Sequence, residues 1–245
     1  MTKLAIFDCD GTLVDSGATI HAALGTALGA HGHDCPPPAV TRQVIGLSLD
    51  EAMAALVPEA DYSQLSRSYK DAFVAMRGAG QVEEPLYDGI TDLLDAREAD
   101  GWLLGVATGK SDRGLRHCLT IHGIFDRFIT LQTADRHPSK PHPAMALAAM
   151  AEAGAEPHRT VFIGDTGWDM GCARAAGCGA IGAGWGYHEL DELRAMGAHF
   201  VAGQPAERTK PAVANEIGKC VCQSEQDNQQ PEQAGHCEQQ EPAPP

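Results

Sequence analysis

Short apolar runs alternate with amphipathic segments along most of the chain. Five runs have the length and composition of buried parallel strands, at residues 3–7, 102–107, 128–131, 160–163 and 180–182. The segments between most of them suit helices, at residues 89–100, 112–122, 143–154 and 168–177. This alternation predicts an α/β fold with a parallel sheet covered on both faces. Ligands on such sheets bind beyond the carboxyl ends of the strands.

One interval, residues 16–84, interrupts the alternation because its apolar positions follow a helical pattern and include no convincing strand. Runs of Pro at 36–38 and Gly-Ala-Gly at 78–80 punctuate it. It is predicted to be a small helical domain inserted after the first strand. An insert that leaves from the carboxyl end of a strand would overhang the ligand-binding edge of the sheet.

Composition changes near the end of the chain, where Gln, Glu and Pro dominate from residue 219. Such a segment buries too little apolar surface to offset its ordering entropy, so a mostly disordered tail is expected over 207–245. The core domain is predicted to comprise residues 1–15 and 85–206, and the inserted helical domain residues 16–84. Zinc is not expected in the tail, since the spacing there fits no compact zinc module: Cys220, Cys222, His236 and Cys237.

The net charge of the 245-residue chain is −15, and this acidity argues against nucleic acid or anionic membranes as partners. No stretch has the length and apolar character of a membrane span or a secretory signal, so a cytoplasmic location is expected. The eight Cys show no framework spacing and are expected to be free thiols. Monomer and homodimer both remain open.

The strongest chemical signal is the segment from Asp8 to Ser16, which directly follows a predicted buried strand and reads Asp-Cys-Asp-Gly-Thr-Leu-Val-Asp-Ser. Two carboxylates two residues apart at a strand end can share one cation. Asp8 would offer a carboxylate oxygen and Asp10 its backbone carbonyl, and hard oxygen ligands of this kind suit Mg²⁺. Gly11 would let the backbone turn tightly beside the ligand.

This segment resembles the first motif, Asp-x-Asp-Gly-Thr, of the haloacid dehalogenase superfamily in its phosphatase branch. The resemblance implies that Asp8 attacks phosphorus, while Asp10 protonates the leaving oxygen and then deprotonates water. Dehalogenases of the family lack the second acid, because a departing halide needs no proton. Asp10 therefore favours phosphoryl chemistry.

Three further segments match the later motifs of this family in order. Thr108 and Gly109 correspond to the phosphate-binding second motif, and Lys140 corresponds to the cation that holds nucleophile and phosphate together. Asp165 and Asp169 match the fourth motif, Gly-Asp-x-x-x-Asp, and are expected at the Mg²⁺ site, Asp165 as a direct ligand and Asp169 through metal-bound water or Lys140. Lys110, which comes directly after Gly109 of the second motif, is expected to be a solvated surface residue.

The resemblance covers about residues 3–205 and implies a three-layer Rossmann-like core with an all-helical cap of the family's first type. Residues 46–48 resemble the cap loop that approaches the substrate, where family members carry a Gly. Arg42 is the nearest cap cation to that loop, and we expect it to meet a carboxylate or phosphate of the substrate.

The expected activity is Mg²⁺-dependent hydrolysis of a small phosphorylated metabolite, similar to phosphoglycolate, through an aspartyl-phosphate at Asp8. A phosphomutase similar to β-phosphoglucomutase and a pyrophosphatase of the same family remain alternatives, since both would keep these acids. A catalytically silent protein that acts through binding, with its cap or its tail, is a further alternative. Replacement of the motif acids or of Lys140 would favour this alternative, and the chain has all of these residues.

Overall fold

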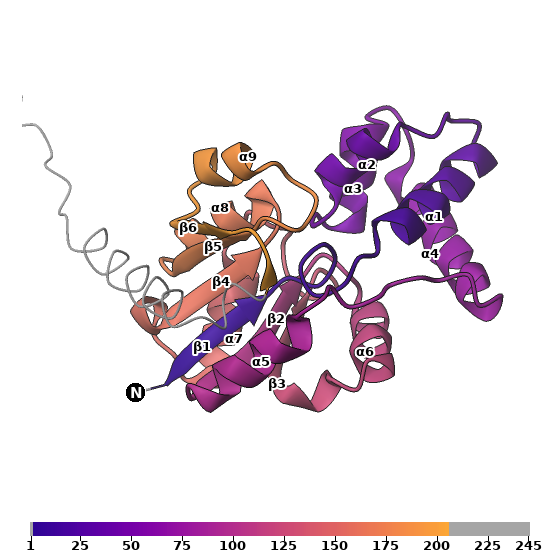
Figure 1. The fold of residues 1–245 in the computed structure, drawn as a ribbon. Helices are drawn as coiled ribbons and strands as arrows, with labels where there is room; N and C mark the ends of the chain where they lie inside the picture. Colours follow the sequence, from indigo (N-terminus) through magenta and orange to yellow (C-terminus); the bar gives the residue numbers. More distant parts are fainter. Residues whose placement is uncertain (1, 206–245) are drawn as a thin grey trace, which may run out of the picture.

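The core of the protein is a six-stranded parallel sheet with the order β3-β2-β1-β4-β5-β6 (Figure 1). The computed structural model describes residues 2–205. All five predicted strands are present, and β1 lies between β2 and β4 in the middle of the sheet. The strand bounds are β1 Lys3–Phe7, β2 Trp102–Thr108, β3 Phe128–Thr133, β4 Thr160–Gly164, β5 Gly179–Ala183 and β6 Phe200–Ala202.

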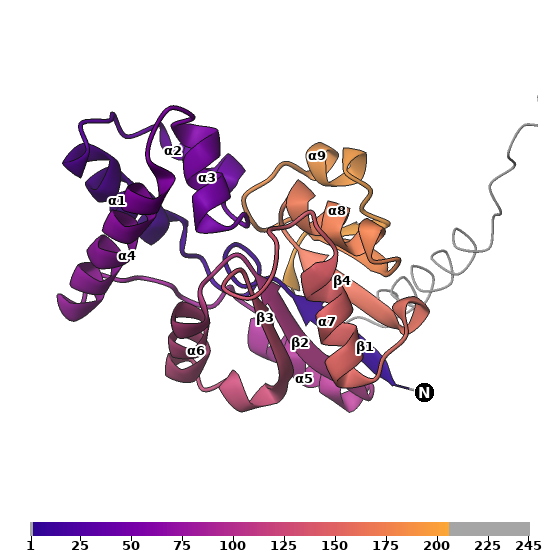
Figure 2. The same cartoon turned by 180° about the vertical axis from the view of Figure 1, so that it is seen from behind.

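Helices cover both faces of the sheet, so the predicted three layers are confirmed (Figures 1 and 2). Side chains that alternate along β1 are buried on opposite faces of the sheet. Ala5 and Phe7 pack into one hydrophobic cluster, and Leu4 and Ile6 pack into the other. The first cluster includes α5 (Ile90–Ala99) and α6 (Asp112–Ile121). The second includes α7 (Ala144–Ala153), α8 (Gly167–Ala175) and α9 (Leu190–Ala195).

The segment between β1 and β2 forms a helical cap beyond the carboxyl ends of the strands (Figure 1). It contains α1 (Gly17–Ala30), α2 (Pro38–Val44), α3 (Leu49–Leu56) and α4 (Tyr62–Gly78). The cap has a small core of its own, made of Leu24, Leu28, Met53 and Leu65. The helical character predicted for this interval is confirmed.

The two connections between cap and core run side by side. The backbone N–H of Asp15 donates to the carbonyl of Pro85 at 2.9 Å, and Val14 forms an isolated antiparallel bridge with Leu86. Entry to the cap and exit from it are therefore joined by backbone hydrogen bonds next to the end of β1.

The strand β6 and the helix α9 were not predicted from the sequence. β6 is only three residues long and pairs with β5 alone at the edge of the sheet, so it lacks the longer apolar run of a central strand. The predictions about the tail and its zinc site fall on residues 207–245, outside the described residues.

Among the helices within residues 2–205, none combines the length and apolar character needed to span a membrane. The cysteines of this part of the chain are free thiols, as predicted for them: Cys9, Cys35, Cys118, Cys172 and Cys178.

Candidate active site

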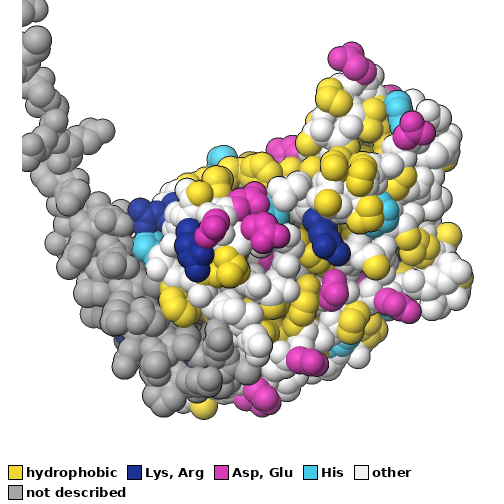
Figure 3. Space-filling model, turned by 45° about the horizontal axis from the view of Figure 1, so that its top comes forward, with side chains coloured by type: hydrophobic (Ala, Val, Ile, Leu, Met, Phe, Trp, Pro, Cys, Tyr) yellow, Lys and Arg dark blue, Asp and Glu magenta, His cyan; other side chains and the backbone are white. Residues whose placement is uncertain are grey.

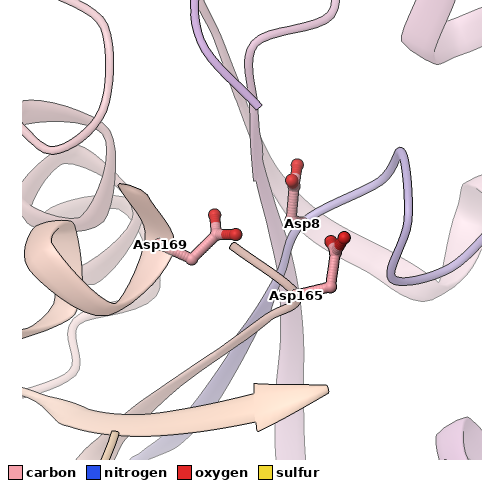
Figure 4. Close-up of side chains that lie close together, drawn as sticks. All are labelled: Asp8, Asp165 and Asp169. Atoms are coloured by element: carbon pink, nitrogen blue, oxygen red, sulfur yellow. The ribbon is translucent and has the colours of Figure 1, made fainter. Parts of the chain in front are cut away.

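Three carboxylates converge where β1 and β4 end, as Figure 4 shows. Asp8 follows β1, Asp165 follows β4, and Asp169 lies in the first turn of α8. Because β1 and β4 are parallel neighbours, their carboxyl ends place the first two acids side by side. One oxygen from each acid lies within 4.8 Å of the others, and all three side chains are buried.

Hydrogen bonds hold Asp165 in place on both of its oxygens. The hydroxyl of Thr12 donates to Oδ1 at 2.8 Å, and the backbone N–H of Tyr187 donates to Oδ2 at 3.0 Å. Gly11, at φ +88°, turns the chain directly over this carboxylate, because a Cβ at that position would lie 2.1 Å from Oδ2. The turn predicted at Gly11 thus requires glycine for both its backbone angle and its space.

Lys140 joins two of the three acids. Its ammonium lies 2.6 Å from Asp169 Oδ1 and 3.0 Å from Asp8 Oδ2, and its side chain is fully buried. Asp169 is fixed in turn by a capping box, in which its other oxygen accepts from the N–H and the hydroxyl of Thr166 while Thr166 caps α8. The structure thus brings together Asp8, Lys140, Asp165 and Asp169.

The electrostatics of this cluster suit a divalent cation. Burial raises the pKa of Asp8 to about 7, and Asp169 and Asp10 add to the rise while Lys140 opposes it. Burial and the neighbouring acids Asp169 and Asp8 also raise the pKa of Asp165 well above its usual value. Three buried carboxylates share one ammonium, which leaves two negative charges when all are ionised. The carboxylate oxygens and this charge excess fit Mg²⁺, and Asp8, Asp165 and Asp169 would hold it.

Asp10 belongs to a second cluster, separate from the three acids. Its Oδ1 accepts from the hydroxyl of Ser16 at 2.6 Å and from the ammonium of Lys110 at 2.7 Å. The same ammonium donates to Glu84 Oε1 at 2.7 Å. Both contacts of the Asp10 side chain are made by Oδ1, and the predicted role of its backbone carbonyl as a metal ligand stays a prediction.

The expectation that Lys110 is a solvated surface residue is wrong. Its side chain is only 8% exposed, since it lies under the cap and between two carboxylates. Sequence reasoning gave no role to Ser16, at the end of the segment that resembles the first motif, and missed Glu84, which belongs to no motif. They come from the two connections between cap and core, and only the fold brings them to Asp10.

Thr108 and Gly109 lie at the end of β2, where the cap touches the core. Thr108 is buried, and its hydroxyl accepts from the backbone N–H of Lys110 at 3.3 Å. A Cβ on Gly109 would lie 2.2 Å from the carbonyl oxygen of Leu47, so the cap loop rests directly on this glycine. The phosphate-binding roles of Thr108 and Gly109 stay predictions.

The cap loop at residues 46–48 makes further contacts with the core. Gly46 has φ +95°, and a Cβ there would lie 3.2 Å from the hydroxyl oxygen of Thr166. The N–H of Ser48 donates to Ser139 Oγ at 2.7 Å, and the indole of Trp168 donates to the carbonyl of Gln43 at 3.2 Å. These contacts set the cap beside both Lys140 and Asp169, the sequence neighbours of Ser139 and Trp168.

A cavity of about 680 Å³ lies between cap and core and is lined by Asp10, Gly109 and Lys110 on the core side. Its cap wall is largely apolar and includes Leu47, Met53, Tyr69 and Phe73. Arg42 is exposed and is not among the lining residues, so its predicted contact with substrate stays a prediction.

On the face drawn in Figure 3, the Lys and Arg side chains of the described residues form no broad basic surface. Acidic and hydrophobic side chains separate them. The acidic net charge of the chain agrees with this arrangement.

Comparison with known proteins agrees with this geometry. The chain is 35% identical to the probable phosphatase IndB of Dickeya dadantii over 80% of its own length and 86% of that protein. It is 32% identical to a phosphoglycolate phosphatase of Xylella fastidiosa, over 86% of this chain and 93% of that one. The solved structure of a hydrolase from Pseudomonas syringae matches with a TM-score of 0.77 and 26% identity, over 88% of this chain and 99% of that chain.

A family model described as haloacid dehalogenase-like hydrolase matches residues 5–183. This range includes the strands and loops that carry Asp8, Thr108, Lys140 and Asp165. The chain therefore belongs to the haloacid dehalogenase-like hydrolase family.

Proposed function

We propose that this protein is a Mg²⁺-dependent phosphatase that hydrolyses a small phosphomonoester through an aspartyl-phosphate at Asp8. The observation that carries the proposal is the buried cluster of three acids and Lys140, with the second acid-lysine cluster of Asp10 beside it and a cavity between core and cap. The similarity to a probable phosphatase and to phosphoglycolate phosphatases supports the same reaction class.

In the first step an oxygen of Asp8 attacks phosphorus, the Asp8 O–P bond forms, and the bond from phosphorus to the leaving oxygen breaks. Asp10 gives its proton to that oxygen, so the product leaves as an alcohol. Asp8 is oriented for this by the N–H of Cys9, which donates to Oδ1 at 2.7 Å, and by Lys140 near Oδ2. When bound, Mg²⁺ supplies positive charge that lowers the repulsion between the carboxylate and the phosphate dianion.

In the second step a water attacks phosphorus and passes one proton to the Asp10 carboxylate. The Asp8 O–P bond breaks, inorganic phosphate leaves, and both acids return to their starting states. Thr108 and the backbone N–H of Gly109 are proposed to bind phosphoryl oxygens, and Lys140 to offset their charge during both steps. Arg42 is retained as a proposed contact for the rest of the substrate.

The experiment that tests the proposal is phosphate release from p-nitrophenyl phosphate and a panel of phosphorylated metabolites, with phosphoglycolate first among them. Activity should require Mg²⁺, be lost on chelation, and disappear in Asp8→Asn, which lacks the nucleophile. Retained turnover in a folded Asp8→Asn protein would contradict the mechanism. Formation of glucose 6-phosphate from β-glucose 1-phosphate, without phosphate release, would instead identify a mutase.

A further inference from the structure

The cap helix α4 presents one of its faces to the cavity between cap and core. Residues spaced three or four apart along the helix form this face and line the cavity: Lys70, Phe73, Val74 and Arg77. Lys70 and Val74 are exposed, whereas Phe73 and Arg77 are partly buried. Arg77 is therefore the more buried of the two cations on this face, and the proposed mechanism does not use it.

The guanidinium of Arg77 has donors that no described residue accepts. Its Nε and Nη2 are shielded from solvent and have no hydrogen-bond partner within residues 2–205. A buried N–H without an acceptor is unfavourable, and more so on a charged group. These two nitrogens form one edge of the guanidinium, and an oxyanion can accept two parallel hydrogen bonds from that edge. Arg77 thus has the donors for an anion that the described protein does not supply.

The other cations that line the cavity have different surroundings. Lys110 already donates to two carboxylates, each at 2.7 Å. Lys70 and Arg113 are exposed, so solvent screens their charges. An anion that enters the cavity therefore gains most at Arg77, where neither a protein carboxylate nor solvent satisfies the two donors.

Acids also line the cavity, but they are not the partners of Arg77. Besides Asp10 they are all exposed, and each accepts a hydrogen bond from another residue: Asp50 from Ser66, Glu51 from Ser48, and Asp135 from the backbone N–H of Asp112. Solvent screens these exposed carboxylates, so they weaken the attraction between Arg77 and an incoming anion only modestly.

Arg77 lies on the side of the site that receives the leaving group. Its Cζ is 5.3 Å from the centre of the Phe73 ring, and the ammonium of Lys110 is 5.7 Å from the same centre. Lys110 in turn donates to Asp10, the proposed acid for the leaving oxygen. A leaving group that extends from Asp10 along Phe73 would bring an anionic end to Arg77. The cavity of about 680 Å³ has room for such a substrate.

We propose that Arg77 is a specificity-determining residue that binds an oxyanion of the leaving group, so that the enzyme prefers phosphomonoesters whose leaving group carries a carboxylate or a second phosphate. This inference rests on the proposed phosphatase function and names its substrate class. To make the contact, the guanidinium turns into the cavity about the rotatable bonds of its side chain. Carboxylate and phosphate share the chemistry required, since each accepts two parallel N–H bonds.

The test compares kcat/KM within matched pairs of esters in the presence of Mg²⁺. Phosphoglycolate and the longer phosphooxybutyrate are each paired with their carboxamide, which has nearly the same size and lacks the charge. Butanediol bisphosphate is paired with butanediol monophosphate. The wild-type protein should favour the charged member of at least one pair by about tenfold or more. The pair with the largest preference identifies the anion as carboxylate or phosphate.

Arg77→Gln removes the charge and should abolish this preference, while kcat/KM for the uncharged esters stays unchanged. Arg77→Lys keeps the charge but lacks the planar edge of two donors, so it should retain only part of the preference. Arg67→Gln is the matched control, because it makes the same change in charge at an exposed position of α4 that does not line the cavity. It should keep the wild-type preference.

Two results would overturn the inference. One is a wild-type protein that favours the charged member of none of the pairs, and the other is a full preference in folded Arg77→Gln. If Arg77→Gln does not fold, the wild-type preference and its partial loss in Arg77→Lys decide.

The outcomes also separate this inference from the proposed function. Turnover of p-nitrophenyl phosphate that depends on Mg²⁺ and Asp8 supports the phosphatase whatever the preference within the pairs is. If neither that ester nor any member of the pairs releases phosphate, the proposed function and the inference both fail.

Discussion

The two acid-lysine clusters of the active site have a similar arrangement but carry different net charges. In the core cluster Lys140 lies between Asp8 and Asp169, and in the cap-side cluster Lys110 lies between Asp10 and Glu84. Each lysine is buried with two carboxylates. The core cluster has a third acid, Asp165, and the cap-side cluster has no third acid among the described residues.

This difference assigns different chemistry to the two clusters. The core cluster has an excess of two negative charges when its acids are ionised, which one divalent cation can neutralise. The cap-side cluster has an excess of one, which a single proton on Asp10 removes. Under the proposed mechanism, the core cluster is the metal-binding half of the site and the cap-side cluster is the proton-transfer half.

Among the variants that test this difference between the two clusters, Asp165→Asn is expected to have the largest effect on activity. Loss of this charge leaves the core cluster with the balance of the cap-side cluster, so Mg²⁺ affinity and kcat/KM should each fall by about 100-fold or more, beyond the roughly 10–100-fold cost of altering groups around a metal ligand. A Mg²⁺ titration of activity measures both.

The same variant should be more stable than the wild-type protein when metal is chelated. Burial and neighbouring acids raise the pKa of Asp165, so its ionised form is unfavourable in the metal-free fold. The melting temperature in chelator should rise by about 2–4 °C, if the gain is about 1 kcal/mol. An unchanged Mg²⁺ requirement together with a lower melting temperature would contradict the assignment of Asp165.

A smaller effect is expected for Mg²⁺ affinity as a function of pH. The pKa of Asp8 in the metal-free fold is about 7, above the ordinary 3.8, so folding favours the protonated acid. The resulting stabilisation is complete below pH 3.8 and is lost as the pH rises through 7. Metal must displace this proton, so affinity should increase by up to about tenfold per pH unit below 7 and level off above it.

Calorimetric titration of Mg²⁺ between pH 6 and 8 would check this prediction. Asp8→Asn is the control, because it lacks one of the two carboxyl groups whose pKa is raised and should show a flatter dependence. A Mg²⁺ affinity that declines with rising pH would contradict the assignment of the excess negative charge to the core cluster.

The smallest effect is expected for Gly109→Ala, which alters the contact between the cap loop and the core next to Lys110. The new methyl group would lie 2.2 Å from the Leu47 carbonyl, so the cap loop must move away. KM should rise about tenfold or less, and the melting temperature should fall, because the overlapping atoms belong to the backbone of the cap loop. Gly29→Ala, in α1 with nothing within 4 Å of the added Cβ, is the matched control and should leave KM unchanged.

The core cluster was largely predictable from the sequence, and the cap-side cluster was not. Asp8 and Asp165 each follow an apolar strand, and the parallel pairing of these strands brings their carboxyl ends to one edge. Glu84 follows no strand and lies 26 residues from Lys110 in the sequence. Its burial depends on how the cap connections pack, and local sequence does not encode that packing.

Lys110 illustrates the same limit. A lysine after a strand is usually solvated, and here only the docked cap and two distant carboxylates make burial possible. The edge strand β6 was missed for a related reason, since three residues carry too little periodic signal.

The paired connections between cap and core join the movement of one to the chemistry of the other. Asp15 and Pro85 are hydrogen bonded, and their sequence neighbours Ser16 and Glu84 hold Asp10 and Lys110. The same two connections therefore carry the chain into and out of the cap and also position the proposed proton donor Asp10, Ser16 by a direct hydrogen bond and Glu84 by way of Lys110. A substitution that loosens either connection is expected to disturb the position of the cap and the setting of Asp10 together.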